Sequence, residues 1–160
     1  MKRTMTAIAA AFALAGCIND SYTADDGAFV VRHGDGGLIE EFEQRLAYLN
    51  MTETPVRIEG FCASACTMYL GADDVCISRD ANFAFHGPSD PAFLTLAPYV
   101  RADRDEWLDR LTAPYPPRLR AWFYESAADK FFGPAFRHLS AAEVQTLTDV
   151  PYCEGGDDGD

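Results

Sequence analysis

The chain has little positive charge. Its 160 residues include 13 lysines and arginines against 25 aspartates and glutamates, which gives a formal net charge of −12. Nucleic-acid binding needs clustered basic side chains, so this balance argues against a nucleic-acid partner. It also argues against electrostatic attachment to anionic lipid, so we expect any membrane contact to come from a covalently attached lipid.

A run of apolar residues long enough to cross a bilayer is also lacking. The most apolar stretch, Met5–Ala15, has only Thr6 as a polar residue and is eleven residues long, whereas a transmembrane helix needs about 20. It follows Lys2 and Arg3, an arrangement typical of a signal peptide. We therefore expect an exported protein that works in the periplasm or elsewhere in the cell envelope.

The end of this signal can be interpreted in two ways. Leu14-Ala-Gly-Cys17 resembles a bacterial lipobox, which implies that residues 1–16 are removed and that Cys17 becomes a lipidated first residue. The alternative is ordinary cleavage after Ala15, which also fits the small-residue rule and would leave a secreted protein.

Four further cysteines remain in an exported chain, and an even number there favours disulfides. Four cysteines allow three pairings, of which we expect Cys66–Cys76 with Cys62–Cys153. The second bridge would tie the polar C-terminal segment to the core. A zinc site formed by Cys62, Cys66, Cys76 and His86 is the competing interpretation. The C-x₃-C spacing is not the usual paired one, so we expect neither metal nor cofactor.

Strand and helix patterns alternate from residue 28 onward. Ala28–Arg32 and Pro55–Glu59 predict strands, and Leu38–Asn50 between them predicts an amphipathic helix with Leu38 on its apolar face. This order predicts an α/β layered core with mostly parallel strands. The further patterns predict short strands at 75–78 and 83–85, helices at 99–112 and 119–128, and a capped helix starting near Ser140.

These elements make up one domain. We expect it to extend over residues 28–153, preceded by a tether at 17–27 and followed by a disordered acidic tail at 154–160.

Ser64 is the residue whose surroundings best fit a nucleophile. It lies in Gly60-Phe-Cys-Ala-Ser-Ala-Cys-Thr-Met-Tyr-Leu70, at a predicted turn from a strand to a short apolar helix. The N–H groups at a helix N-terminus lack partners and favour negative charge. A serine also needs a base, and His86 follows the next apolar run. An oxyanion hole needs two N–H donors, which we assign to Ala65 and to Gly37 or Gly36.

This block resembles a known family. The pattern G-x-C-x-S-A-C-T, with Cys76 and then Phe85-His86, is similar to small exported relatives of the Clp protease proteolytic subunit, within the Clp/crotonase superfamily. Arg32–Gly37 resembles the family's Gly-Gly loop, and Leu139–Val144 resembles its late helix. The resemblance implies a Clp/crotonase-like layered α/β core that is shortened at its N-terminal side and stapled by disulfides.

The same resemblance implies a peptidase-like serine hydrolase that acts on a peptide or acyl substrate and can form homo-oligomers. Export excludes a cytosolic ATPase as its partner. The family's acid precedes the late helix, where Asp129 is the nearest candidate; Asp149, Asp35 and a Ser–His dyad without an acid are the alternatives.

Two other classes of protein compete with the hydrolase. One is a non-catalytic envelope lipoprotein that acts as a binding or scaffold module. The other is an acyl-CoA enzyme of the crotonase type, which fits poorly because the coenzyme is cytosolic.

Overall fold

The computed structural model describes residues 19–24, 26–88, 104–130 and 135–154. The predicted signal peptide, Cys17 and the last six residues lie outside this part of the chain. The elements, in chain order, are β1 (Asn19–Thr23), β2 (Phe29–Gly34), α1 (Ile39–Met51), β3 (Val56–Ala63), the 3₁₀ helix η1 (Ser64–Gly71), β4 (Val75–Ile77), β5 (Asn82–Phe85), α2 (Arg104–Thr112), α3 (Pro117–Ser126), β6 (Arg137–Ser140) and α4 (Ala141–Thr148).

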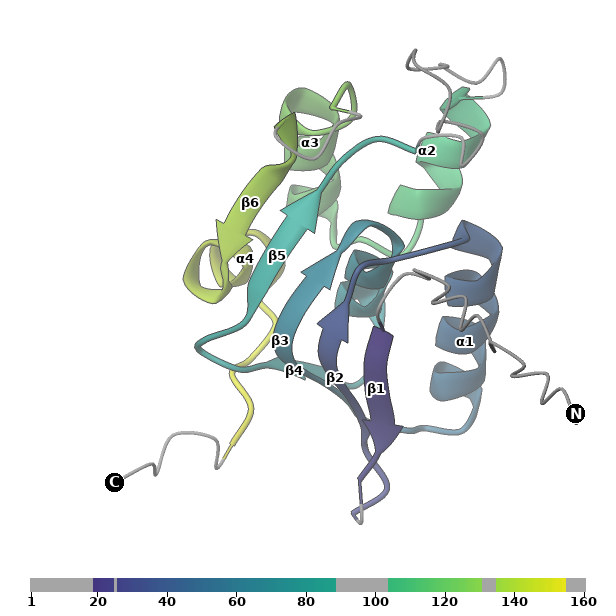
Figure 1. The fold of residues 1–160 in the computed structure, drawn as a ribbon, viewed down its shortest axis with the longest axis vertical. Helices are drawn as coiled ribbons and strands as arrows, with labels where there is room; N and C mark the ends of the chain where they lie inside the picture. The colour runs from purple at the N-terminus through teal and green to yellow at the C-terminus, as the bar shows by residue number, and fades with distance from the viewer. Residues whose placement is uncertain (1–18, 25, 89–103, 131–134, 155–160) are drawn as a thin grey trace, which may run out of the picture.

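One mixed sheet organises these elements, in the strand order β1-β2-β3-β5-β6, with β4 paired to β3. The pairs β2–β3, β3–β4 and β3–β5 are parallel, whereas β1 and β6 add antiparallel strands at the two ends of the order. Figure 1 shows β2, β3 and β5 running in the same direction. The predicted α/β class and the parallel pairing of the central strands are confirmed.

Two strands were not anticipated. β1 lies within residues 17–27, which we expected to be a tether, and its pairing with β2 places this segment in the sheet. β6 directly precedes the predicted capped helix and pairs with β5. Both strands are short and largely polar, so neither carries the apolar alternation that identifies a strand in a sequence.

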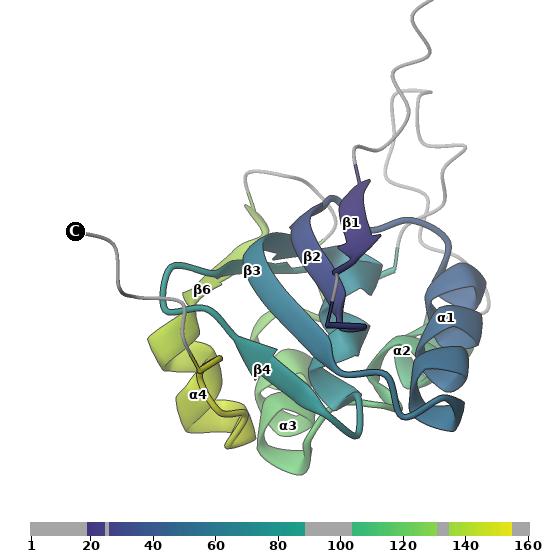
Figure 2. The same cartoon turned by 90° about the horizontal axis from the view of Figure 1, so that it is seen from below.

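The 3₁₀ helix η1 lies in the centre of the core. Its residues Ala65 to Leu70 are all buried, as expected for a helix that is apolar on every side. It contacts α1, α2, β3 and β5, and Figure 2 shows α1, α2 and α3 on one side of the sheet. The turn that begins η1 is therefore anchored in the buried core.

The predicted apolar face of α1 is largely confirmed, because Ile39, Phe42, Leu46 and Leu49 are buried. Leu38 is the exception. It precedes the first helical turn and is 54% exposed. At the other end of the domain, Ser140 and Glu143 form the predicted capping box of α4. Among the described residues, no helix combines the length and apolar character that crossing a membrane requires.

Candidate active site

Ser64 lies at the point where β3 becomes η1. It follows Ala63, the last residue of β3, and is the first residue of η1. Its φ of 56° is in the left-handed region, which costs a non-glycine residue of order 1 kcal/mol. The side chain is partly exposed, whereas the six residues after it are buried. The predicted strand-to-helix turn at Ser64 is confirmed.

Gly36 lies against this turn. Its φ is +89°, and a Cβ atom on it would lie 2.6 Å from the Ser64 Cβ, 2.9 Å from the Ala63 carbonyl oxygen and 3.0 Å from the Ala65 nitrogen. Only glycine leaves room for this approach. The fold therefore brings the predicted glycine turn and the predicted nucleophile together, although α1 separates them in the chain.

The second glycine of this turn has different neighbours. A Cβ atom on Gly37 would lie 3.5 Å from the Phe42 ring, which is an ordinary contact. The α-carbon that touches the Ser64 turn is thus that of Gly36, and the peptide group that leaves this α-carbon carries the N–H of Gly37.

His86 reaches the same edge of the sheet as Ser64. β3 and β5 are parallel neighbours in which Ala63 pairs with Ala84. Ser64 is one residue beyond this pair and His86 two residues beyond it. The carboxyl ends of parallel strands meet at one edge of a sheet, which is where α/β proteins place their ligands. The loop that carries Gly36 follows β2, which is also a parallel neighbour of β3.

The His86 ring has a defined tautomer. Its Nδ1 lies 2.7 Å from the carbonyl oxygen of Gly87, and a carbonyl can only accept, so Nδ1 carries the proton. In the neutral ring, Nε2 then has the free lone pair that a general base needs. Burial lowers the pKa of His86, with a smaller opposing effect from the Gly87 carbonyl. The ring is therefore neutral at pH 7.

One face of the His86 ring is covered by Phe136. The two ring centroids are 4.0 Å apart with an interplanar angle of 10°. This contact follows from strand register. Phe85 pairs with Arg137 in the antiparallel β5–β6 ladder, so the next positions outward are His86 and Phe136.

The Ser64 hydroxyl and the His86 ring are not hydrogen-bonded to each other in the described part of the chain, where the ring nitrogen Nδ1 bonds Gly87. Catalytic hydrogen bonds of this kind are often long before substrate binds.

The three carboxylates considered as the acid have other partners. Asp129 is hydrogen-bonded to the Lys130 ammonium at 2.5 Å, and its side chain is 69% exposed. Asp149 pairs with Arg118, and Asp35 lies 3.0 Å from the His33 ring.

The Asp129–Lys130 segment nevertheless supports the base through its backbone. The Gly87 N–H donates to the Lys130 carbonyl at 2.8 Å. The Gly87 carbonyl then accepts from His86 Nδ1. This carbonyl occupies the place at the imidazole that an aspartate takes in a serine protease triad.

The disulfides are Cys62–Cys66 and Cys76–Cys153, so the predicted pairing of Cys66 with Cys76 and of Cys62 with Cys153 is wrong. The reversal of the chain at Ser64 brings Cys66 back beside Cys62, with α-carbons 5.4 Å apart. The C-terminal segment runs alongside β4, because the Cys153 N–H donates to the Ile77 carbonyl, and this places Cys153 next to Cys76.

Two consequences follow from the pairing. The first bridge encloses Ser64, and the second ties the C-terminal segment to the core, as expected. The two bridges together use all three cysteines of the competing zinc site, Cys62, Cys66 and Cys76. Disulfides form in oxidising surroundings, so they suggest an extracellular or periplasmic location.

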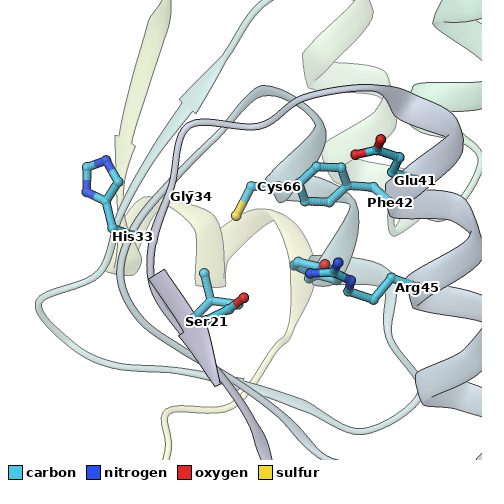
Figure 3. A pocket seen from close by; sticks show the side chains of 9 residues that line it. Ser21, His33, Gly34, Glu41, Phe42, Arg45 and Cys66 are labelled. Carbon is cyan, nitrogen blue, oxygen red and sulfur yellow. The ribbon is translucent and has the colours of Figure 1, made fainter. Parts of the chain in front are cut away.

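A small cavity of about 50 Å³ is lined by residues of β1, β2, α1 and η1 (Figure 3). Arg45 of α1 and Ser21 of β1 lie at it, and the Cys66 sulfur points toward it. Burial raises the pKa of Tyr69, which lines it, to about 12. In Figure 3 the His33 ring points away from the other labelled side chains. The full lining is Ser21, Val31, His33, Gly34, Glu41, Phe42, Arg45, Cys66 and Tyr69, and so includes neither Ser64 nor His86.

Sequence reasoning missed the residues that hold the site from behind. Thr67, three residues after Ser64, bonds back to the Ser64 carbonyl, a local pattern that its spacing could have suggested. Tyr115, Phe136 and the Gly87 carbonyl meet the site only through the fold, and nothing in their sequence surroundings indicated this.

A scan against protein-family models and a search of curated proteins found no match to this chain.

Proposed function

We propose that this protein is an exported serine hydrolase, peptidase-like in type and related to the Clp/crotonase superfamily. In this proposal Ser64 is the nucleophile and His86 is the base. The observation that carries it is the close approach of Gly36 to Ser64 and Ala65. This approach places two backbone segments at one strained serine, which is the arrangement that an oxyanion hole requires.

The reaction would begin at the imidazole. His86 Nε2 takes the Ser64 proton while Oγ forms a bond to the acyl carbon of the substrate. The Ala65 N–H and the Gly37 or Gly36 N–H bind the oxyanion. The imidazolium then gives its proton to the leaving group as the old acyl bond breaks. Water, activated by the same imidazole, hydrolyses the acyl-enzyme and restores Ser64.

The contact at His86 Nδ1 favours a dyad over a triad. The Gly87 carbonyl holds the tautomer, but it carries no full negative charge to stabilise the imidazolium. Replacing the aspartate of a serine protease triad lowers kcat about 10⁴-fold. We therefore propose a hydrolase that is slower than one with a complete triad.

The remaining assignments belong to this proposal as well. The substrate is a peptide or another acyl compound. The protein is attached to the cell envelope through a lipid on Cys17 and can associate with further copies of itself. The proposal includes no nucleic-acid partner, because the chain is acidic.

Fluorophosphonate labelling tests the proposal, because the probe reacts with a serine only where a base activates it. Purified protein lacking residues 1–16 should be labelled, and Ser64→Ala should abolish labelling. Ser89 follows Pro88 in a Pro-rich stretch of the sequence, where a serine is expected to be a turn residue, so Ser89→Ala should leave labelling unchanged. The melting temperature of Ser64→Ala should match that of the parent protein or exceed it, since the Ser64 side chain makes no hydrogen bond to the residues that the structure describes.

The alternative makes the opposite prediction. A folded, disulfide-bonded protein that the probe does not label would indicate a binding or scaffold module. Labelling that survives Ser64→Ala would remove Ser64 from its role.

A further inference from the structure

Two buried hydroxyl groups lie directly behind the Ser64 turn. Thr67 Oγ1 is 2.6 Å from the Ser64 carbonyl oxygen and 2.5 Å from the Tyr115 hydroxyl. Thr67 is fully buried, and Tyr115 is 5% exposed. We call these two groups the Thr67–Tyr115 hydroxyl pair. Thr67 lies in η1, whereas Tyr115 comes from the connection between α2 and α3.

The direction of each hydrogen bond follows from elementary chemistry. The Ser64 carbonyl can only accept, so the single Thr67 proton points to it. Thr67 Oγ1 must then accept its second hydrogen bond from the Tyr115 hydroxyl. Burial raises the pKa of Tyr115, so the phenol keeps the proton that it donates. The pair is a fixed chain from Tyr115 to Thr67 to the Ser64 carbonyl.

The Ser64 carbonyl belongs to the same peptide group as the Ala65 N–H. This group is planar and trans, so the C=O and the N–H point in opposite directions. A hydrogen bond that holds the carbonyl toward the core therefore aims the N–H away from it. The Ala65 nitrogen is near Gly36, as a Cβ atom on Gly36 would lie 3.0 Å from it.

We propose that Thr67 and Tyr115 are positioning residues that hold the Ser64–Ala65 peptide group with its N–H directed into the oxyanion hole. This role rests on the proposed hydrolase function. A residue at positive φ persists only where its surroundings over-determine it. The hydroxyl pair supplies that constraint on the side opposite Gly36.

Three substitutions separate this role from simple packing. Thr67→Val keeps the shape and removes the hydroxyl. Thr67→Ser keeps the hydroxyl and removes the methyl group. Tyr115→Phe removes the second hydroxyl and keeps the ring, which packs on Phe85 and Phe123. The matched control is Tyr124→Phe, whose hydroxyl bonds Asp109 at the surface.

The measurement is the rate of Ser64 modification by a fluorophosphonate at saturating probe, together with the probe concentration at half-saturation. Loss of one oxyanion donor lowers kcat about 10²–10³-fold, and misdirecting it costs less. We expect Thr67→Val to lower the saturating rate about 10-fold or more, and Tyr115→Phe about 3-fold, with little change in half-saturation. Thr67→Ser and Tyr124→Phe should retain the parent rate.

Two rate outcomes would overturn the proposal. One is a folded Thr67→Val variant and a folded Tyr115→Phe variant that both react at the parent rate. The other is a saturating rate that falls as far in Thr67→Ser as in Thr67→Val, which would show that the lost methyl packing, and not the hydroxyl, causes the effect. Should Thr67→Val fail to fold, Tyr115→Phe alone decides the question.

A second readout does not depend on activity. In ¹H–¹⁵N spectra of ¹⁵N-enriched protein without the probe, the resonance of the Ala65 amide should shift in Thr67→Val and in Tyr115→Phe. This shift should be larger than that of the Leu70 amide in the same helix. The Ala65 resonance should not shift in Tyr124→Phe. An unmoved Ala65 amide would overturn the positioning role even if the probe labels Ser64. If the Ala65 amide shifts in a protein that no probe labels, the hydrolase proposal is refuted. The hydroxyl pair would then still orient the Ser64–Ala65 peptide group.

Discussion

The Ser64 turn and the end of β5 at His86 are held by different kinds of contact. The Ser64 turn is enclosed by a disulfide, flanked by Gly36 and bonded from behind by Thr67. His86 has a stacked ring on one face and a hydrogen bond to the next residue in the chain. The nucleophile is thus constrained by a covalent bridge and by contacts that reach into the buried core, whereas the base is held by one ring contact and by a hydrogen bond to the neighbouring residue.

This difference has a consequence for substitutions. Changes around Ser64 should alter both reactivity and stability, because the same contacts anchor the core helix η1. Changes around His86 should mainly alter its protonation and leave the free energy of unfolding nearly unchanged. The predictions below test this distinction from the largest expected effect to the smallest.

Gly36→Ala should have the largest effect on labelling. The new methyl group would lie 2.6 Å from the Ser64 Cβ, so we expect no detectable fluorophosphonate labelling. Strain at positive φ costs about 1 kcal/mol and overpacking a further 1–3 kcal/mol, roughly. Urea unfolding measures this loss of stability.

The matched control for this substitution is Gly27→Ala. Gly27 has a φ of +86°, and a Cβ atom there would have no neighbour within 4 Å. This variant should show the strain alone and label at the parent rate. Normal labelling of Gly36→Ala would contradict the arrangement of the site.

Removal of the Cys76–Cys153 bridge should cost more stability, whereas removal of the Cys62–Cys66 bridge should cost more reactivity. On the chain-entropy view, the Cys76–Cys153 bridge, with a sequence separation of 77, contributes about 4.5 kcal/mol and the Cys62–Cys66 bridge about 2 kcal/mol. Paired replacement by alanine therefore destabilises more at the C-terminal bridge, as urea unfolding should show.

The labelling rate should respond mainly to the other bridge. We expect replacement of Cys62 and Cys66 to lower it at least about tenfold, because misplacing a catalytic group by about 1 Å can cost 10²-fold. Replacement of Cys76 and Cys153 should leave it within about twofold in protein that remains folded. The reverse order of rates would contradict the special position of the Ser64 turn.

The labelling rate should fall with decreasing pH as His86 becomes protonated. Because burial lowers the pKa of His86, its neutral form persists below pH 6.5, and the acid limb of the profile should lie below that ordinary value. Phe136→Ala uncovers the ring and should move the limb up toward 6.5.

Phe61→Ala is the control for this profile. Phe61 packs on His33, with ring centroids 5.3 Å apart, and His33 has no part in the proposed reaction. The acid limb of the labelling profile should therefore lie at the same pH in Phe61→Ala as in the parent protein. An acid limb that moves in Phe61→Ala, or that does not move in Phe136→Ala, would assign the titration to a group other than His86.

Asp129→Asn should have the smallest effect. The Asp129 carboxylate is exposed and bonded to Lys130, and the hydrogen bond of Lys130 to Gly87 uses its backbone carbonyl. We expect a labelling rate within about twofold of the parent. A fall approaching the 10⁴-fold loss seen on replacing a triad aspartate would identify Asp129 as the acid of a complete triad.

Most of the correct structural predictions came from local sequence patterns. The apolar spacing of α1, the capping box at Ser140 and the strand-to-helix turn at Ser64 were predicted correctly, although β3 continues to Ala63 rather than ending at the predicted Glu59. Each depends on residues within a few positions of one another. β1 and β6 were missed because they are held at the ends of the sheet by pairing with distant strands rather than by an apolar pattern of their own.

The sequence by itself determined the α/β class, the presence of disulfides and the turn at Ser64, because periodicity, cysteine number and small residues act over short stretches of chain. Only the tertiary structure decided which cysteines pair, which glycine faces Ser64 and what the His86 ring contacts. These outcomes depend on strand register and on the path of the C-terminal segment, and both are set when distant segments pack against one sheet.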